Sequence, residues 1–88
     1  MERLFFPCRI SGPDGAGWYC VVVPGPNVNA QGRTEAEALI EAAEILQDVL
    51  EDCVRDGEAL PAPADGDIYS DDFPRVGVIQ AVIPAAAA

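Results

Sequence analysis

The sequence predicts an α+β domain in which three strands precede one long helix and a fourth strand follows it. Between residues 31 and 57, apolar residues recur at spacings of three and four, which is the period of an amphipathic helix. Short runs rich in β-branched and aromatic residues stand on both sides, separated by glycine and proline turn signals. The resulting β-β-β-α-β order predicts a three-stranded antiparallel meander, one long helix on one face, and a returning fourth strand.

The ends of the helix are marked by local signals. Thr34 is a good N-cap, and Glu37 stands where a capping box places its acid, so that each residue can bond the backbone amide of the other. Gly57 suits the left-handed position that follows a helix, and Arg55 lies in the last turn, where a cation is favoured. The helix is therefore expected from Glu35 to Asp56.

The two faces of this helix differ in chemistry. Three residues on one flank widen the apolar stripe and would serve either the core or a subunit contact; these are Ala38, Ile45 and Val49. The stripe itself, expected to be buried, holds Ala36, Leu39, Ala43, Leu46, Leu50, Cys53 and Val54. The opposite face holds Glu37, Glu41, Glu44, Asp48, Glu51 and Asp52. This acidic face is either an ordinary solvated surface or a surface shaped for a basic partner.

Four strands are expected, over residues 3–10, 18–23, 28–31 and 75–83. A hairpin centred near Asp14 would pair Ile10 with Trp18, Cys8 with Cys20, and Phe6 with Val22, and this face is expected to meet the helix. Neighbouring Cys8 and Cys20 are either small core residues or a redox pair. The other face would then carry Phe5, Arg9, Tyr19, Val21 and Val23, an apolar surface expected to mark an interface and hence a homo-oligomer, a dimer or tetramer.

Between the helix and the last strand the chain is acidic and rich in proline. This connection must return the chain along the helix, and its Asp65, Asp67, Asp71 and Asp72 add to the negative surface. Their spacing does not fit a calcium-binding loop, because Tyr69 stands where an oxygen ligand is needed. We expect a single domain over residues 1–84 and an alanine tail over residues 85–88.

Composition narrows the functional classes. The 88 residues carry a net charge of −10, which disfavours direct DNA or RNA binding and favours basic protein partners. The absence of histidine removes histidine-activated nucleophiles and the usual zinc sites, so we expect no enzyme activity, metal or cofactor. No apolar run is long enough to span a membrane. Three cysteines without a signal peptide favour a cytoplasmic location.

Several segments resemble the HicB-like antitoxins of bacterial toxin–antitoxin pairs. The entry to the helix, AQGRTEAEAL over residues 30–39, is similar to the family pattern QG-x-T-x-x-EA, and its exit RDGEALPAP, residues 55–63, is similar to x-x-G-E-x-I-P-x-P. Phe6-Pro7 in the first strand and Gly17-Trp18-Tyr19 in the second also match. The turn at Pro24-Gly25-Pro26-Asn27-Val28 departs from the family's usual PDLPGC.

The resemblance implies a partial RNase H-like fold without nuclease activity. It also implies the function of neutralising a small basic HicA-like toxin that cleaves messenger RNA. The residues expected to contact such a toxin are Glu37, Glu41, Glu44, Asp48, Glu51, Asp52, Asp67 and Asp71, with Tyr19 and Val21 as apolar anchors beside Phe5. Many members carry a DNA-binding segment after the last strand, and none is expected here. The alternative is an orphan HicB-like module that self-associates without a cognate toxin.

Overall fold

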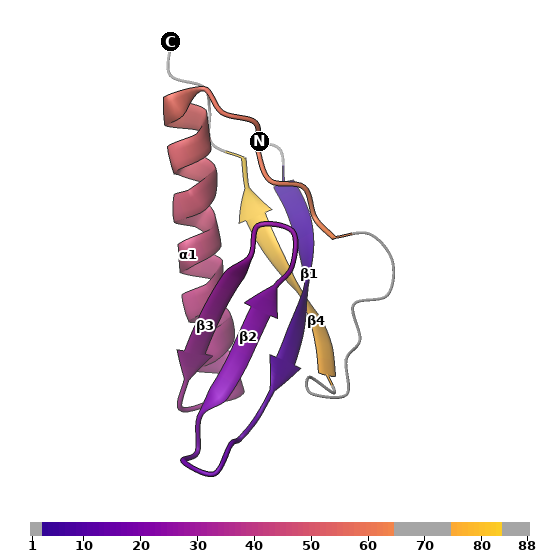
Figure 1. Cartoon of the computed structure of the whole chain (residues 1–88), viewed down its shortest axis with the longest axis vertical. Helices are drawn as coiled ribbons and strands as arrows, with labels where there is room; N and C mark the ends of the chain where they lie inside the picture. Colours follow the sequence, from indigo (N-terminus) through magenta and orange to yellow (C-terminus); the bar gives the residue numbers. More distant parts are fainter. Residues whose placement is uncertain (1–2, 65–74, 84–88) are drawn as a thin grey trace.

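The computed structural model describes residues 3–64 and 75–83, and it has the predicted α+β architecture. Its elements, in chain order, are β1 (Arg3–Ser11), β2 (Tyr19–Val23), β3 (Val28–Gly32), α1 (Glu35–Asp56) and β4 (Arg75–Val82). The strands form one sheet in the order β3-β2-β1-β4, and every neighbouring pair is antiparallel (Figure 1). The predicted meander, long helix and returning fourth strand are confirmed.

Local capping fixes both ends of α1 where the sequence predicts them. The Thr34 Oγ1 accepts the Glu37 amide at 3.1 Å, and Gly57 takes the left-handed conformation with φ 71°. The Glu58 amide then donates to the Cys53 carbonyl at 2.8 Å, which closes the last turn. One detail differs from a capping box: the Glu37 carboxylate accepts the amide of Arg33, at 3.0 Å, instead of that of Thr34.

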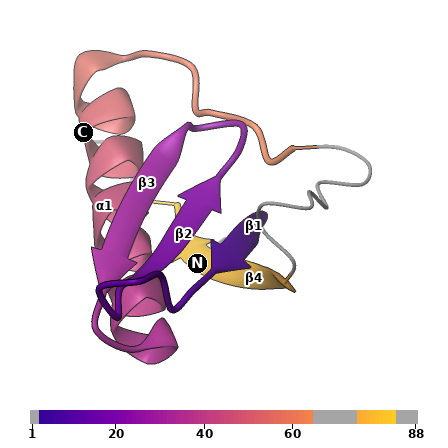
Figure 2. The same ribbon diagram turned by 60° about the horizontal axis from the view of Figure 1, so that its bottom comes forward.

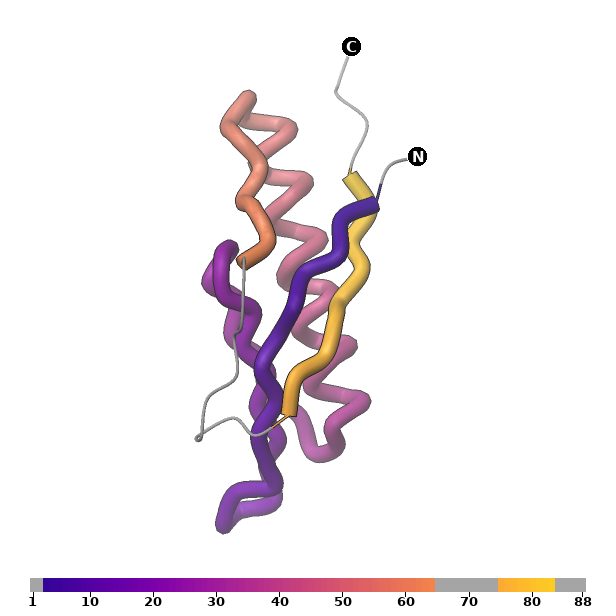
Figure 3. The backbone as a smooth tube through the Cα atoms, turned by 90° about the vertical axis from the view of Figure 1, so that its right-hand side faces the viewer, coloured from indigo at the N-terminus to yellow at the C-terminus, as the bar shows by residue number. Residues whose placement is uncertain are grey.

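α1 covers one face of the sheet and leaves the other face without a helix (Figures 2 and 3). Its fully buried side chains are Ala38, Ala42, Leu46 and Leu50, which pack against Phe6, Cys8 and Ile10 of β1, Val21 and Val23 of β2, Val28 and Ala30 of β3, and Ile79 and Ala81 of β4.

The buried stripe of α1 is rotated from the predicted one: Ala36 is exposed, whereas Ala38 and Ala42 are fully buried. The short link from β3 explains this rotation, because it presses the first helical turn against the strand. A Cβ on Gly32 would lie only 2.5 Å from the Ala38 nitrogen. Only glycine fits at this approach.

The pairing of β1 with β2 differs from the prediction by three residues. Ile10 pairs with Val21, not Trp18, and Ser11 pairs with Cys20. An odd shift turns a strand over, because side chains alternate between the two faces. The expected placement of Tyr19, Val21 and Val23 on the face away from the helix is therefore wrong: they face α1, and Val21 and Val23 are fully buried.

The turn before β2 gives the physical reason for the shift. The Asp14 amide donates to the Trp18 carbonyl at 2.9 Å, and the Asp14 Oδ1 accepts the amides of Ala16 and Trp18 at 2.8 and 2.9 Å. Asp14 therefore opens the tight part of the loop instead of standing at its centre. The centre lies between Gly15 and Ala16, which moves every β2 residue along β1.

Candidate partner-binding surface

The solvent side of α1 is a continuous acidic face. Because 3.6 residues make one turn, acids at spacings of three and four stay on the same side over several turns. The structure brings together all of the helical acids predicted to bind a partner, and each of them is exposed: Glu37, Glu41, Glu44, Asp48, Glu51 and Asp52. We call these six residues the acidic face.

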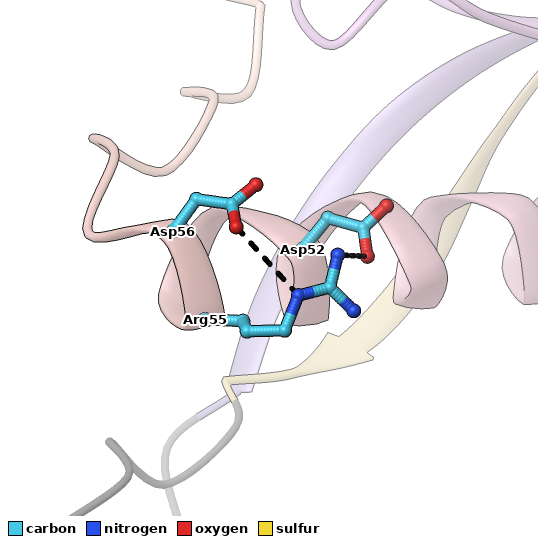
Figure 4. A network of polar contacts seen from close by, with 3 residues as sticks. All are labelled: Asp52, Arg55 and Asp56. Atoms are coloured by element: carbon cyan, nitrogen blue, oxygen red, sulfur yellow. Dashed lines mark hydrogen bonds and ion pairs between the residues drawn. The ribbon is translucent and has the colours of Figure 1, made fainter.

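Arg55 is the one cation of α1, and it lies at the end of the acidic face. Its guanidinium contacts Asp52 at 2.7 Å and Asp56 at 3.6 Å, so it compensates charge only in the last turn (Figure 4). Within residues 3–64 and 75–83, no cationic side chain lies within ion-pairing distance of the four central acids of this face, Glu41, Glu44, Asp48 and Glu51. These carboxylates are left to water or to a partner.

A shallow hollow of about 600 Å³ adjoins the acidic face along strand β3. Glu41 belongs to both, so an acidic surface and a partly apolar groove meet at this residue. The apolar part comes from Trp18, in the loop just before β2, and from Ile45 on α1. The full lining is Trp18, Cys20, Asn29, Ala30, Gln31, Glu41 and Ile45. Such a combination suits a basic surface that also presents an apolar side chain.

The apolar anchors predicted from sequence are placed differently from expectation. Val21 is fully buried and Tyr19 packs partly against the core, so neither side chain lies on the outer face of the sheet. Phe5 is exposed there as expected, on the side of the sheet away from α1. The predicted contacts at Asp67 and Asp71, with Asp65 and Asp72, lie outside the described residues.

Trp18 is the groove residue that sequence reasoning missed as a binding candidate, whereas Ile45 was expected to serve the core or a subunit contact. The expected hairpin turned Trp18 toward the core, whereas its ring lies under the Arg33 guanidinium, 4.2 Å from the ring centroid. The β2–β3 register could have predicted this contact. Tyr19 pairs with Gly32, so the residues just beyond that pair, Trp18 and Arg33, stand opposite each other. Ile45 follows from periodicity, as a residue on the margin of the apolar stripe.

The cysteines do not form the expected neighbouring pair. Cys8 is buried on the helix side of β1, whereas the turned-over β2 directs Cys20 to the other face. Burial raises the pKa of the Cys8 thiol, and loss of solvent raises the pKa of Cys20, so neither sulfur is prepared as a thiolate nucleophile.

The described part of the chain contains neither a cluster of metal ligands nor a membrane-crossing helix. In residues 3–64 and 75–83, no group of three or more cysteine, aspartate or glutamate side chains is placed to hold a metal ion. None of the helical structure in those ranges has both the length and the apolar character needed to cross a bilayer.

Comparisons with known proteins relate the fold to one solved complex. No protein-family model matches the chain. No curated protein matches it. A chain of a toxin–antitoxin complex from Streptococcus pneumoniae superposes with a TM-score of 0.75 at 20% sequence identity, and the match covers 93% of this chain and 71% of that one. The two chains share a fold.

Proposed function

We propose that this protein is an antitoxin that binds and masks a small basic HicA-like toxin, an enzyme that cleaves messenger RNA. The observation that carries the proposal is the acidic face, whose six carboxylates are all exposed on one side of α1. The fold shared with a chain from a toxin–antitoxin complex supports it. So does the HicB-like pattern of residues around the two ends of α1.

In this proposal the protein acts by binding and has no catalytic step of its own. A toxin that holds RNA must present positive charge toward the phosphate backbone. An acidic helix competes for that charge, and complementary potentials also accelerate the encounter of the two proteins. The groove beside Glu41 adds an apolar contact through Trp18 and Ile45, which fixes one docking orientation.

Charge reversal on the acidic face tests this proposal. The partner to test is the product of any small basic reading frame adjacent to the gene, by co-expression and by titration calorimetry with purified proteins. In the double variant Glu41→Lys/Asp48→Lys, we expect the affinity to fall by at least about tenfold at low salt, because two attractive groups become repulsive. The dependence of the affinity on salt should also become weaker.

A matched control separates local recognition from net charge. Asp56→Lys/Glu58→Lys makes the same change in net charge at the end of the helix, where both residues are exposed. This control should retain neutralisation of toxicity and most of the affinity. Equal affinities for the wild type and Glu41→Lys/Asp48→Lys at low salt would show that the acidic face is only a solvated surface. Persistent toxicity on co-expression with the wild type would end the antitoxin proposal.

The second candidate is an orphan HicB-like module that self-associates without a toxin. The exposed large side chains of Phe5, Val76 and Val78 on the outer face of the sheet favour it. A gene with no basic neighbour, and a chain that captures only copies of itself, would distinguish this function from the first.

A further inference from the structure

Strand β4 lies at one edge of the sheet, and that edge is partly closed by a side chain from the helix. Gln47 of α1 donates from Nε2 to the Val82 carbonyl at 2.8 Å and accepts the Val82 amide on Oε1 at 3.1 Å. The amide side chain thus takes the place that a neighbouring strand would take at Val82. Both backbone groups of Val82 therefore point away from β1.

This contact fixes the direction of the other backbone groups of β4. In an antiparallel pair, alternate residues direct both their N–H and C=O toward the same neighbour. Val76, Val78 and Gln80 therefore also direct their backbone groups to the free edge. Pro7, which has no N–H, lies opposite Val78 in β1 and agrees with this assignment, because Val78 does not bond to β1.

The side chains around this edge are apolar and exposed. Val76 is 50% exposed and Val78 63%, and Phe5, which lies on the adjacent strand, is 58% exposed. Ile40 of α1 is 59% exposed. It stands seven residues before Gln47, two helical turns or about 10.5 Å along the same flank. Ile40 therefore lies on the flank of α1 from which Gln47 reaches Val82.

The usual protection of an edge strand is weak here. Natural edge strands carry lysine, proline, bulges or inward charges that discourage pairing with another chain. Residues 76–82 contain no charged residue and no proline. Arg75, the only charged residue of β4, already contacts Glu35 at 2.7 Å. Among residues 3–64 and 75–83, Gln47 is the side chain that bonds to this edge, and it closes only the last position of the strand, at Val82.

We propose that the free edge of β4 pairs with β4 of a second copy of this chain, antiparallel about a two-fold axis at Val78. Val78 would then face its own copy, and Val76 would face Gln80 of the other copy in both directions. The three pairs would exchange about six backbone hydrogen bonds, two for each pair. The two sheets would join into one continuous sheet.

The register follows from Gln47. A two-fold axis at Gln80 would set Val82 against Val78 of the other copy, which requires Gln47 to leave Val82. An axis at Val76 would leave Val78 and Gln80 opposite residues that precede β4. Val78 is the centre that uses all three open residues and keeps the contacts of Gln47.

Charge selects a second copy over a basic protein at this edge. Strand β4 and the neighbouring Phe5 offer no carboxylate to attract cations. The acidic face turns away from the sheet, and the hollow that adjoins it lies along β3, at the opposite edge. The paired β4 strands therefore bring no carboxylate against each other, despite a net charge of −10 on each chain.

The experiment is sedimentation equilibrium on the purified chain alone, over a wide range of concentration. The wild type should be a dimer, and Val78→Lys should raise the dimer dissociation constant at least about 100-fold, because it places two like charges at the axis. Asn29→Lys is the matched control, since it adds the same charge to an exposed position on the opposite edge strand β3, and it should remain dimeric. Circular dichroism and thermal unfolding check that each variant is folded.

A cross-link tests the register independently of variant stability. In Val78→Cys, the two Cα atoms of the central pair would lie about 5.5 Å apart, within the range that a disulfide spans. Oxidation should give a covalent dimer joined at residue 78, located by mass spectrometry, whereas Asn29→Cys should give none.

A wild-type chain that is monomeric at all concentrations, or a dimer that Val78→Lys leaves unchanged, would overturn the proposal. If the chain is monomeric and Val78→Lys abolishes toxin binding, the β4 edge belongs to the toxin interface, and the proposal of self-pairing is overturned. No toxin is present in the sedimentation and cross-linking measurements, so their result is independent of the proposed antitoxin function.

Discussion

The Asp14 carboxylate accepts the amides of Ala16 and Trp18 and so stabilises the turn before β2, and the length of that turn determines which face of the strand is buried. These hydrogen bonds hold the pKa of Asp14 below its ordinary value, and the bond from the Trp18 amide has the largest effect. The carboxylate is therefore bonded best in its ionised form. A single exposed acid thus stabilises the turn of the first hairpin.

Asp14→Ala should lower the melting temperature, and the loss should depend on pH. A carboxyl whose pKa is lowered by folding contributes stability above its unfolded pKa, about 3.9, and loses that contribution as the pH falls through the lower folded value. The difference in melting temperature between wild type and variant should thus be full at pH 7 and shrink below about pH 4. Thermal unfolding from pH 7 to pH 2.5 measures it. A difference that stays constant over this range would show that the ionised carboxylate is not the stabilising group.

Gln47 acts at the same scale, as a single side chain that replaces a strand neighbour at Val82. Gln47→Leu keeps much of the side chain's volume but removes both hydrogen bonds, so the Val82 backbone groups lose their partner. We expect a loss of about 1–2 kcal/mol in the free energy of unfolding, because the site is only partly buried and water can replace part of the bonding. Denaturant unfolding of wild type and variant gives the value. A loss below about 0.3 kcal/mol would mean that water serves Val82 equally well.

At the scale of elements, the sequence predicts most accurately what short-range signals determine. Thr34 and Gly57 are within a turn of the helix ends that they specify, so α1 was predicted to its terminal residues. The buried face of β2 was not predicted correctly. A change in the length of the preceding loop inverts the strand, and the pattern YCVVV is apolar on both sides, so it does not indicate which side is buried. The rotation of α1 also escaped prediction, since it depends on contact between Gly32 and Ala38.

The same distinction applies to the candidate site. The acidic face follows from helical periodicity alone, so all of its members were found in the sequence. The groove requires Trp18, from a loop, and Ile45, from a helix flank, to meet beside β3, which no local pattern specifies. Prediction of the β4 edge would require knowledge of the strand order and of the hydrogen bond between Gln47 and Val82, which are 35 residues apart in the sequence.

The register of β2 gives a direct test at this scale. Val21→Lys should abolish cooperative unfolding, because the side chain is fully buried beneath α1 and an ammonium has no partner there. Val22→Lys should leave a cooperative fold, since Val22 points to the face without a helix. Thermal unfolding followed by circular dichroism compares the two. Equal loss of structure in both variants, or a tolerated lysine at residue 21, would contradict the observed register.

For the whole molecule, the two proposed surfaces lie on different sides. The acidic face and its groove occupy the solvent side of α1 and the β3 edge, whereas the proposed self-pairing uses the β4 edge. Strands β3 and β4 are the two outer strands of the sheet (Figure 1). A dimer formed through β4 would leave both acidic faces open. Each copy could then hold one toxin, and the two-fold axis would relate the two bound toxins.

The concentration of acids on α1 implies a balance between stability and binding in the molecule. Glu44 has like charges three residues before it, at Glu41, and four residues after it, at Asp48, and such pairs repel along an exposed helix. Glu44→Lys converts both repulsions into attractions, so it should raise the free energy of unfolding by about 0.5–1 kcal/mol at low salt and by less at high salt.

The same variant should weaken binding of the basic toxin at low salt, because the centre of the acidic face becomes cationic. Both effects are measured by denaturant unfolding and by toxin titration of the wild type and Glu44→Lys, at low and at high salt. In each measurement Glu44→Gln should give a value between those of the wild type and Glu44→Lys. A variant that gains stability without losing affinity would show that these acids serve the solvation of the helix alone. Opposite changes in the two quantities would show that α1 gives up part of its own stability to present an anionic surface to a partner.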